Sequence, residues 1–597
     1  MYVSPANSGN VNLKWGSSNY TTAPPYPATY EGIPYNTEVR LEAMPASGYS
    51  FSHWTWTLPD ETVTVNPYVW TTNCSRAVTA NFRIGAATTT MTVSVSPAGS
   101  GTVKVNGTTY GPPYPRTVSG ITLNSTVNLE AVPASGYSFS NWSGDKTGTA
   151  NPTTLVANSS KTFAANFTTA PPPGQGYKLY FPHVASLIGS APLWETEVCV
   201  INTGSQAVTG ILKSYKDDGQ AASANKTITL AAHGRWSRIV GAGEFSNPSQ
   251  IGYMFFESNS DSIVGYVKFY REGLYRAAVP AAKVVNTLKI YVPHIASSNQ
   301  WWTGVSLVNT TGTGKNLTMI FNDGQRRTIP LAANQHIIFQ IRDLFNGQPQ
   351  PLIQSAVINN TTGVIGLLLF GTGDGSNLLE GIPLTSKTAS TLFYPHVASD
   401  DIWWTGIVAY NTLPLLNTLT ITPYSALGLP LAPLTLDIPG LGKYVDTFSE
   451  LGLPAETAWF RIDSTRPLSG FELFATHDGN QLAAYSDVGG TGAKAGVFPK
   501  IEKDGWTGIA FVNTENAVAT VSLKAYDDSG TALATQVISV GAYAKEVHVV
   551  EEMFAPSIIS NATYIAYSAN RNIVGFQLNG SLDGTMLDGL PGLGSPN

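Results

Sequence analysis

The sequence predicts an all-β protein in which two small β-rich repeats are followed by four immunoglobulin-like β-sandwich modules in tandem. Two observations predict this class. Charged residues make up only 12% of the 597-residue chain, whereas it has 57 glycines and 27 tyrosines, a composition typical of strands and tight turns. The chain also repeats itself with two different periods, which indicates several domains rather than one.

The first repeat is the most regular part of the sequence. Residues 41–54 recur almost unchanged as residues 129–142, and each copy follows a Pro-Pro-Tyr-Pro segment. Both the apolar alternation and the turn residues repeat, so two tandem domains are the simplest interpretation. We expect bacterial β repeats at residues 1–86 and 87–169.

The second copy carries the segments Asn141-Trp142-Ser143-Gly144-Asp145 and Ala165-Asn166-Phe167. In these residues it resembles the divergent internalin-type repeat of bacterial cell-surface proteins. The first copy departs from the pattern, with Thr55-Trp56-Thr57 after its tryptophan. The resemblance implies a small β-rich spacer or adhesion module without enzymatic activity. Trp54 and Trp142 occupy the same repeated position and are expected in the core rather than against a sugar.

A Pro-rich linker is expected at residues 170–176, because Ala170-Pro171-Pro172-Pro173-Gly174 cannot pair as a strand. A second repeat then begins with Pro followed by His or Lys, continues with a Trp-Thr-Gly strand, and contains a hairpin turn and one expected helical turn. Its four copies predict β-sandwich modules at residues 177–286, 287–389, 390–493 and 494–597. They resemble the poorly characterised Pro-His/Trp-Thr-Gly modules of secreted bacterial proteins, which implies an extracellular location but no established activity.

The repeated histidines invite a metal or acid-base interpretation. His183, His294 and His396 begin three modules, and Lys500 takes the fourth position. In a linear array of modules they would lie far apart, so we expect each imidazole to serve its local backbone. Recognisable zinc, nucleophile and phosphate-loop motifs are absent, and the acidic turns carry too few carboxylates for calcium. The sequence predicts no catalytic residues, no metal site and no cofactor.

Paired tryptophans are the better candidates for ligand binding. Neighbouring side chains on a strand point to opposite faces, so one indole of each pair in Trp301-Trp302 and Trp403-Trp404 is expected in the core. We expect Trp302, Trp404 and Trp506 to be the core residues, and Trp301 and Trp403 to face outward. An outward indole can stack on a sugar, anchor a protein contact or pack against another domain.

Charge and cysteine content limit the partners. The net charge of −6 is spread without acidic or basic blocks, which argues against nucleic acid. Cys74 and Cys199 fall in different domains and are expected as unpaired thiols, and no apolar stretch reaches transmembrane length. The sequence favours a structural or adhesive surface protein, such as a fibre or sheath subunit, that binds copies of itself, other surface proteins or extracellular polysaccharide. A carbohydrate-binding protein is the alternative. An enzyme such as a glycoside hydrolase is not expected, because the repeats fill the chain and no insertion is large enough for a catalytic domain.

Overall fold

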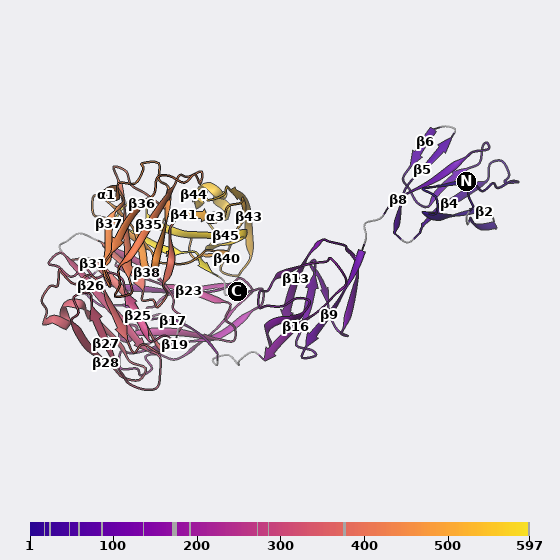
Figure 1. Cartoon of the computed structure of the whole chain (residues 1–597). Helices are drawn as coiled ribbons and strands as arrows, with labels where there is room; N and C mark the ends of the chain where they lie inside the picture. The colour runs from indigo at the N-terminus through magenta and orange to yellow at the C-terminus, as the bar shows by residue number, and fades with distance from the viewer. Residues whose placement is uncertain are drawn as a thin grey trace. The chain divides into compact units, whose positions relative to one another are not determined.

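The computed structural model of the chain confirms the all-β class, with tandem β-rich modules built from small sheets (Figure 1). It describes residues 1–16, 18–22, 25–46, 48–57, 60–84, 88–134, 137–169, 176–189, 191, 193–271, 273–284, 286–373 and 378–594. The fold divides into two compact units, residues 1–169 and 170–596. The expected linker at residues 170–176 lies, except for residue 176, outside the described residues.

The first unit contains two similar domains, each with a core between two four-stranded sheets. Its first domain has the sheets β1-β8-β5-β6 and β3-β2-β4-β7, and its second has β11-β10-β13-β15 and β12-β9-β16-β14. The strands of the first domain are β1 (Tyr2–Ser4), β2 (Gly9–Trp15), β3 (Ser18–Thr22), β4 (Glu38–Pro45), β5 (Tyr49–Thr57), β6 (Asp60–Val63), β7 (Tyr68–Thr71) and β8 (Val78–Ile84). Those of the second domain are β9 (Thr88–Ser96), β10 (Gly101–Val105), β11 (Thr108–Tyr110), β12 (Arg116–Thr122), β13 (Thr126–Pro133), β14 (Tyr137–Gly144), β15 (Thr153–Val156) and β16 (Lys161–Thr169).

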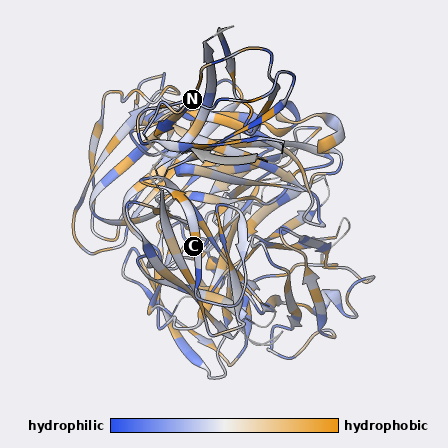
Figure 2. Cartoon of the chain, turned by 90° about the vertical axis from the view of Figure 1, so that its right-hand side faces the viewer, coloured by the Kyte–Doolittle hydropathy of each residue, from blue (hydrophilic) through white to orange (hydrophobic). Residues whose placement is uncertain are grey.

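The two repeated tryptophans lie in the cores, as predicted. Trp54 and Trp142 are fully buried, and each indole N–H donates to a backbone carbonyl, of Val65 and Ala150 respectively. A buried indole needs such a partner, because an unpaired N–H in the core is costly. Buried and more exposed residues alternate along strands such as β2 and β9, and hydrophobic and hydrophilic residues are interspersed along the chain in Figure 2.

The second unit contains four β-sandwiches, named here the first to the fourth sandwich by their strands. The first sandwich comprises β17 (Tyr177–Phe181), β18 (Glu195–Asn202), β19 (Val208–Tyr215), β20 (Lys226–Leu230), β21 (Arg235–Ile239), β22 (Tyr253–Ser258), β23 (Ile263–Arg271) and β24 (Tyr275–Pro280), with η1 (Pro248–Gln250). The second comprises β25 (Lys289–Val292), β26 (Trp301–Asn309), β27 (Lys315–Phe321), β28 (Arg326–Leu331), β29 (His336–Gln340), β30 (Ala356–Asn359), β31 (Val364–Thr372) and β32 (Leu379–Pro383), with η2 (Ile341–Phe345).

The last two sandwiches differ in one respect: a single 18-residue strand, β38 or β45, runs through both layers. The third comprises β33 (Ala389–Tyr394), β34 (Trp403–Asn411), β35 (Asn417–Tyr424), β36 (Leu434–Ile438), β37 (Lys443–Thr447), α1 (Phe448–Leu451), β38 (Trp459–Thr476) and β39 (Leu482–Tyr485). The fourth comprises β40 (Ala493–Phe498), β41 (Gly505–Asn513), β42 (Ala519–Tyr526), β43 (Ala532–Val540), β44 (Lys545–Val549), α2 (Val550–Met553), α3 (Pro556–Ile559), β45 (Tyr564–Ser581), β46 (Leu587–Pro591) and β47 (Leu593–Gly594).

The expected helical turns appear in the last three sandwiches as η2, α1 and α2, whereas residues 241–245 of the first form a hydrogen-bonded turn.

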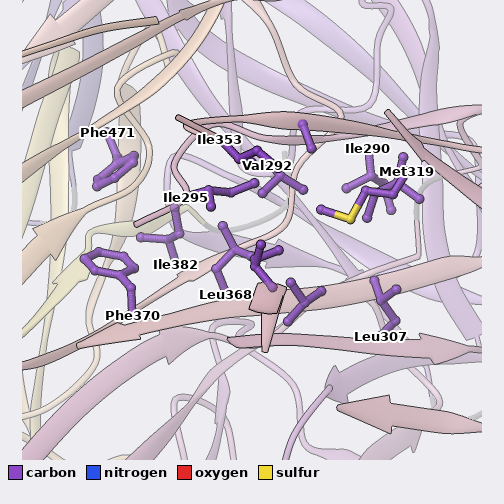
Figure 3. Close-up of a cluster of buried hydrophobic side chains, with 14 of the residues drawn as sticks. Ile290, Val292, Ile295, Leu307, Met319, Ile353, Leu368, Phe370, Ile382 and Phe471 are labelled. Carbon is purple, nitrogen blue, oxygen red and sulfur yellow. The ribbon is translucent and has the colours of Figure 1, made fainter. Parts of the chain in front are cut away.

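The four sandwiches do not form the linear array that the repeats suggested. Strand β24 contacts β32 and β46, and β39 contacts the same two strands. These four strands, one from each sandwich, therefore close a ring. Figure 3 shows one of the contacts: Phe471 of the third sandwich lies beside Phe370 of the second, with ring centroids 6.0 Å apart. Sheet faces that would be exposed in separate modules are covered by the neighbouring sandwich.

Candidate functional site

The Trp-Thr-Gly strand and the Pro-His turn are joined by a threonine. The hydroxyl of Thr303 accepts from the N–H of Ala296 and donates to the carbonyl of the same residue. Thr196 and Thr405 make the same pair of bonds to the alanines that follow His183 and His396. Because these threonines make the same bonds, they are equivalent positions of the repeat. Glu195 is therefore equivalent to Trp302, and Glu197 to Gly304.

Each residue of the Pro-His position reaches the next sandwich in the ring. The distances between ring centroids are 5.4 Å for His183 and His336, 5.7 Å for His294 and Phe471, and 5.9 Å for His396 and Phe576. Lys500 completes the cycle, because its ammonium lies 2.6 Å from the Glu197 carboxylate of the first sandwich. The histidines therefore lie at interfaces between sandwiches, which the local-backbone hypothesis did not include.

The fourth-to-first interface is the most highly charged. Glu197 accepts from Lys500 and from the hydroxyls of Tyr266 and Tyr270, at 2.6 Å in each case. Burial alone would raise the pKa of Glu197, but Lys500, Arg235 and Lys268 hold it well below its usual range. A carboxylate held in this way stays ionised and serves as a structural anion.

A second ionic cluster lies where β24 and β46 meet. Lys268 and Asp588 are completely buried, with 2.7 Å between the ammonium and the carboxylate, and Lys268 also lies 2.8 Å from Glu502. Arg276 binds both of these carboxylates. Burial opposes ionisation of Asp588, yet Lys268 and Arg276 lower its pKa to about 2. Two cations and two anions balance here, so the cluster buries no net charge, and removing one member would leave an uncompensated buried charge.

Two further carboxyl groups at the interfaces have no balancing cation within hydrogen-bonding distance in the part of the chain that the structure describes. Glu380 and Glu472 are completely buried, and burial raises the pKa of both well above the usual range. Among the described residues, one oxygen of Glu380 and both oxygens of Glu472 lack a hydrogen-bond partner, although Lys545 and the His396 N–H lie near enough to Glu472 to oppose the rise of its pKa. Burial therefore favours the neutral, protonated form of both carboxyls, and it also separates them from substrates.

The tryptophan pairs are oriented opposite to the prediction. Trp301 is half-buried and packs against the core cluster of the second sandwich. Trp302 is also half-buried, but it packs with the cluster centred on the first sandwich. Trp404 likewise packs with the cluster of the preceding sandwich. Trp403 shares its strand face with Ile407, which belongs to the core cluster of the third sandwich, so Trp403 also lies on the core side. Ligand binding by Trp301 and Trp403 stays a prediction.

The glycine of each Trp-Thr-Gly segment lies beneath the indole. A Cβ atom built on Gly304 would lie 3.2 Å from the Trp302 ring, and the corresponding distances are 2.9 Å for Gly406 and Trp404 and 3.1 Å for Gly508 and Trp506. Residues two apart on a strand share a face. The glycine therefore lets the indole lie flat along the backbone, which explains why the two residue types recur together.

Two cavities accompany the ring. One, of about 530 Å³, is lined by the segments that follow β24, β32, β39 and β46, and thus by all four sandwiches. The other, of about 300 Å³, is lined by residues of the first-to-second interface, including His183, Trp302 and Gln340. Among the described residues, no group of three or more His, Cys, Asp or Glu side chains is arranged to hold a metal ion.

Cys74 is exposed and Cys199 is buried, and both are free thiols, as expected. In the parts of the chain that the structure describes, no helix is both long and apolar enough to cross a membrane.

Comparison with known proteins supports the interpretation of the first unit. Residues 29–86 and 91–171 match the family model described as "Divergent InlB B-repeat domain". No curated protein matches the chain. Among solved structures, the chain is similar to the SGBP-B protein of the mixed-linkage glucan utilization locus of Bacteroides ovatus, in complex with a mixed-linkage heptasaccharide. The identity is 11%, the match covers 63% of this chain and 94% of that chain, and the TM-score of 0.11 is too low to carry an argument.

Proposed function

We propose that the protein is an extracellular adhesive surface protein that works by association with copies of itself or with an extracellular polymer. One observation carries the self-association. The third residue of each edge strand β29, β37 and β44 is an exposed branched apolar residue: Ile338, Val445 and Val547, with exposed fractions of 56%, 48% and 50%. An edge strand with an apolar outer face is a natural site for strand addition by another chain.

The repetition of this patch strengthens weak contacts. When one patch has bound, the others are held near their partners at a high effective concentration. The low charge of the chain reduces the repulsion between copies. The match of the first unit to a repeat domain fits a spacer or adhesion role for residues 1–169. Assembly into a fibre or sheath belongs to the same proposal.

Sedimentation velocity over a concentration series, followed by negative-stain microscopy, tests the proposal. Val547→Lys places a charge at the centre of β44 and should shift the chain toward monomer. Leu582→Lys is the matched control, because Leu582 is 81% exposed but lies in a turn rather than on an edge strand. A chain that stays monomeric at every concentration and attaches to no cell surface or matrix polymer would contradict the proposed function.

A further inference from the structure

The cleft at the first-to-second interface has the features of a small ligand site. Its volume of about 300 Å³ lies at the lower end of the range for ligand pockets. Apolar walls come from Trp302, Leu367 and Leu369, and polar groups come from His183 and Gln340. This mixture of one flat aromatic wall and a few polar groups is the pattern that fixes both position and orientation of a ligand.

The Trp302 indole is fixed as a platform on two glycines. Cβ atoms on Gly304 and Gly371 would lie 3.2 and 3.4 Å from its ring. The indole N–H is already used, because it donates to the carbonyl of Thr372 at 3.3 Å. Trp302 therefore offers a ligand its apolar ring surface rather than a hydrogen bond. Such a rigid surface binds with little loss of side-chain entropy.

His183 lines the same cleft and carries a buried polar atom that is unused. Its side chain is buried, and Nδ1 has no hydrogen-bond partner among the described residues. Burial, followed by the effect of the neighbouring His336, lowers the pKa of His183 to about 3. The imidazole is therefore neutral at physiological pH. A buried ring nitrogen without a partner is costly, and a ligand hydroxyl that reaches it would remove this cost.

We infer that this cleft binds one or two pyranose units of a neutral polysaccharide, with the apolar face of a sugar on Trp302 and a hydroxyl on His183 Nδ1. Sugars combine an apolar ring face with hydroxyls at its edge, which matches the flat indole and the neutral polar rim. The inference rests on the proposed function and names the polymer class. A charged polysaccharide fits less well, because the residues lining the cleft include Asp343 but no lysine or arginine.

The platform is repeated around the ring, which suits a polymer. Trp404 and Trp506 lie on Gly406 and Gly508 in the same way. The Nδ1 atom of His396 at the third-to-fourth interface also lacks a partner within the described part of the chain. A long polysaccharide that also contacted these interfaces would gain overall affinity with each added contact.

Native affinity electrophoresis tests the inference with the full chain. The gels contain dextran, galactomannan or xyloglucan as neutral probes and alginate as the anionic probe. At least one neutral polysaccharide should retard the protein, and alginate should not. Trp302→Ala should weaken the retardation about tenfold or more, which is the usual effect of truncating a central aromatic anchor. Trp302→Phe keeps a flat ring and should restore most of the binding.

Melting curves of both variants separate loss of binding from loss of folding, and Leu582→Ala, in an exposed turn, should bind like the original chain. Retardation by neutral probes that survives unchanged in a folded Trp302→Ala chain would overturn the inference. So would the absence of retardation by all three neutral probes. Self-association is measured without polysaccharide, so the proposed function can survive either result.

Discussion

Lys500 and Glu197 are separated by 303 residues in the chain, yet the ammonium and carboxylate lie 2.6 Å apart. Both side chains are nearly buried, so this ion pair joins the last sandwich to the first. At the three other interfaces the same two positions hold a histidine and a glycine. Lys500 replaces the histidine and Glu197 replaces the glycine at the same interface, which is the one that closes the ring.

The buried cluster at β24 and β46 should control the stability of the ring. Asp588→Ala would leave Lys268 and Arg276 buried with Glu502 as their remaining anion. Breaking a buried ion pair by removing one partner typically costs about 3–5 kcal/mol. Urea unfolding of the 170–596 unit at pH 7 should show a loss of that size. Unfolding at the original urea concentration would contradict the role of the cluster.

The same residue predicts a pH dependence. The pKa of Asp588 is about 2 in the folded chain and about 3.8 as its ordinary value. Because the folded pKa is the lower one, its contribution to stability is present above pH 4 and is lost as the pH falls toward 2. The difference in unfolding free energy between the original chain and Asp588→Asn should therefore shrink over this window. A difference that stays constant from pH 5 to pH 2 would exclude the ionised cluster as its source.

A second substitution should stabilise the protein at neutral pH. Gln577 occupies the position in the fourth sandwich that Glu472 occupies in the third, and its amide exchanges two hydrogen bonds with the backbone of Lys500. Glu472→Gln should make the same two bonds to His396, which is equivalent to Lys500. Satisfying a buried polar group in this way is worth about 1–3 kcal/mol.

The gain from Glu472→Gln should depend on pH. Because burial raises the pKa of Glu472, the unfolded chain loses this proton first, and stability falls as the pH rises above the ordinary value of 4.5. The glutamine has no such proton. Thermal melts should thus separate the two chains more at pH 8 than at pH 4, and a variant that melts lower at pH 8 would refute the argument.

Two glycines under Trp506 provide a matched pair of substitutions. A Cβ atom on Gly580 would lie 2.2 Å from the indole, whereas one on Gly508 would lie 3.1 Å from it. Gly580→Ala must displace Trp506 and should cost about 1–3 kcal/mol, as overpacking does. Gly508→Ala needs only a small adjustment and should cost less. Equal unfolding free energies for the two variants, measured in urea, would show that the indole is not fixed on Gly580.

The repeats predicted the sandwiches but not the ring. Alternation, turn residues and the Trp-Thr-Gly and Pro-His segments are local, so they indicate strands and domains from sequence alone. Ring closure depends on contacts between residues hundreds of positions apart, and no local pattern encodes these. The departures from the repeat were the usable signal: Glu197 replaces the glycine in one copy and Lys500 the histidine in another. The sequence also did not reveal which tryptophan of each pair faces the core. The single Trp194 of the first copy is equivalent to Trp301, whereas the sequence alone suggests that it is equivalent to Trp302.

The ring replaces the expectation that each sandwich unfolds independently. Removing residues 494–597 would expose Glu197, Lys268 and Arg276 on the first sandwich, and would uncover the apolar residues Cys199, Ile201 and Tyr266, which pack against the fourth. Separate domains melt unchanged when a neighbour is lost, whereas domains that share buried interfaces lose stability together. The remaining three sandwiches should therefore melt at a lower temperature than the intact unit.

In calorimetry of the full chain, residues 170–596 should unfold in one transition whose van't Hoff and calorimetric enthalpies agree, and residues 1–169 should unfold separately. If the first three sandwiches, in a chain that lacks residues 494–597, kept the melting temperature of the full unit, the sandwiches would unfold independently after all.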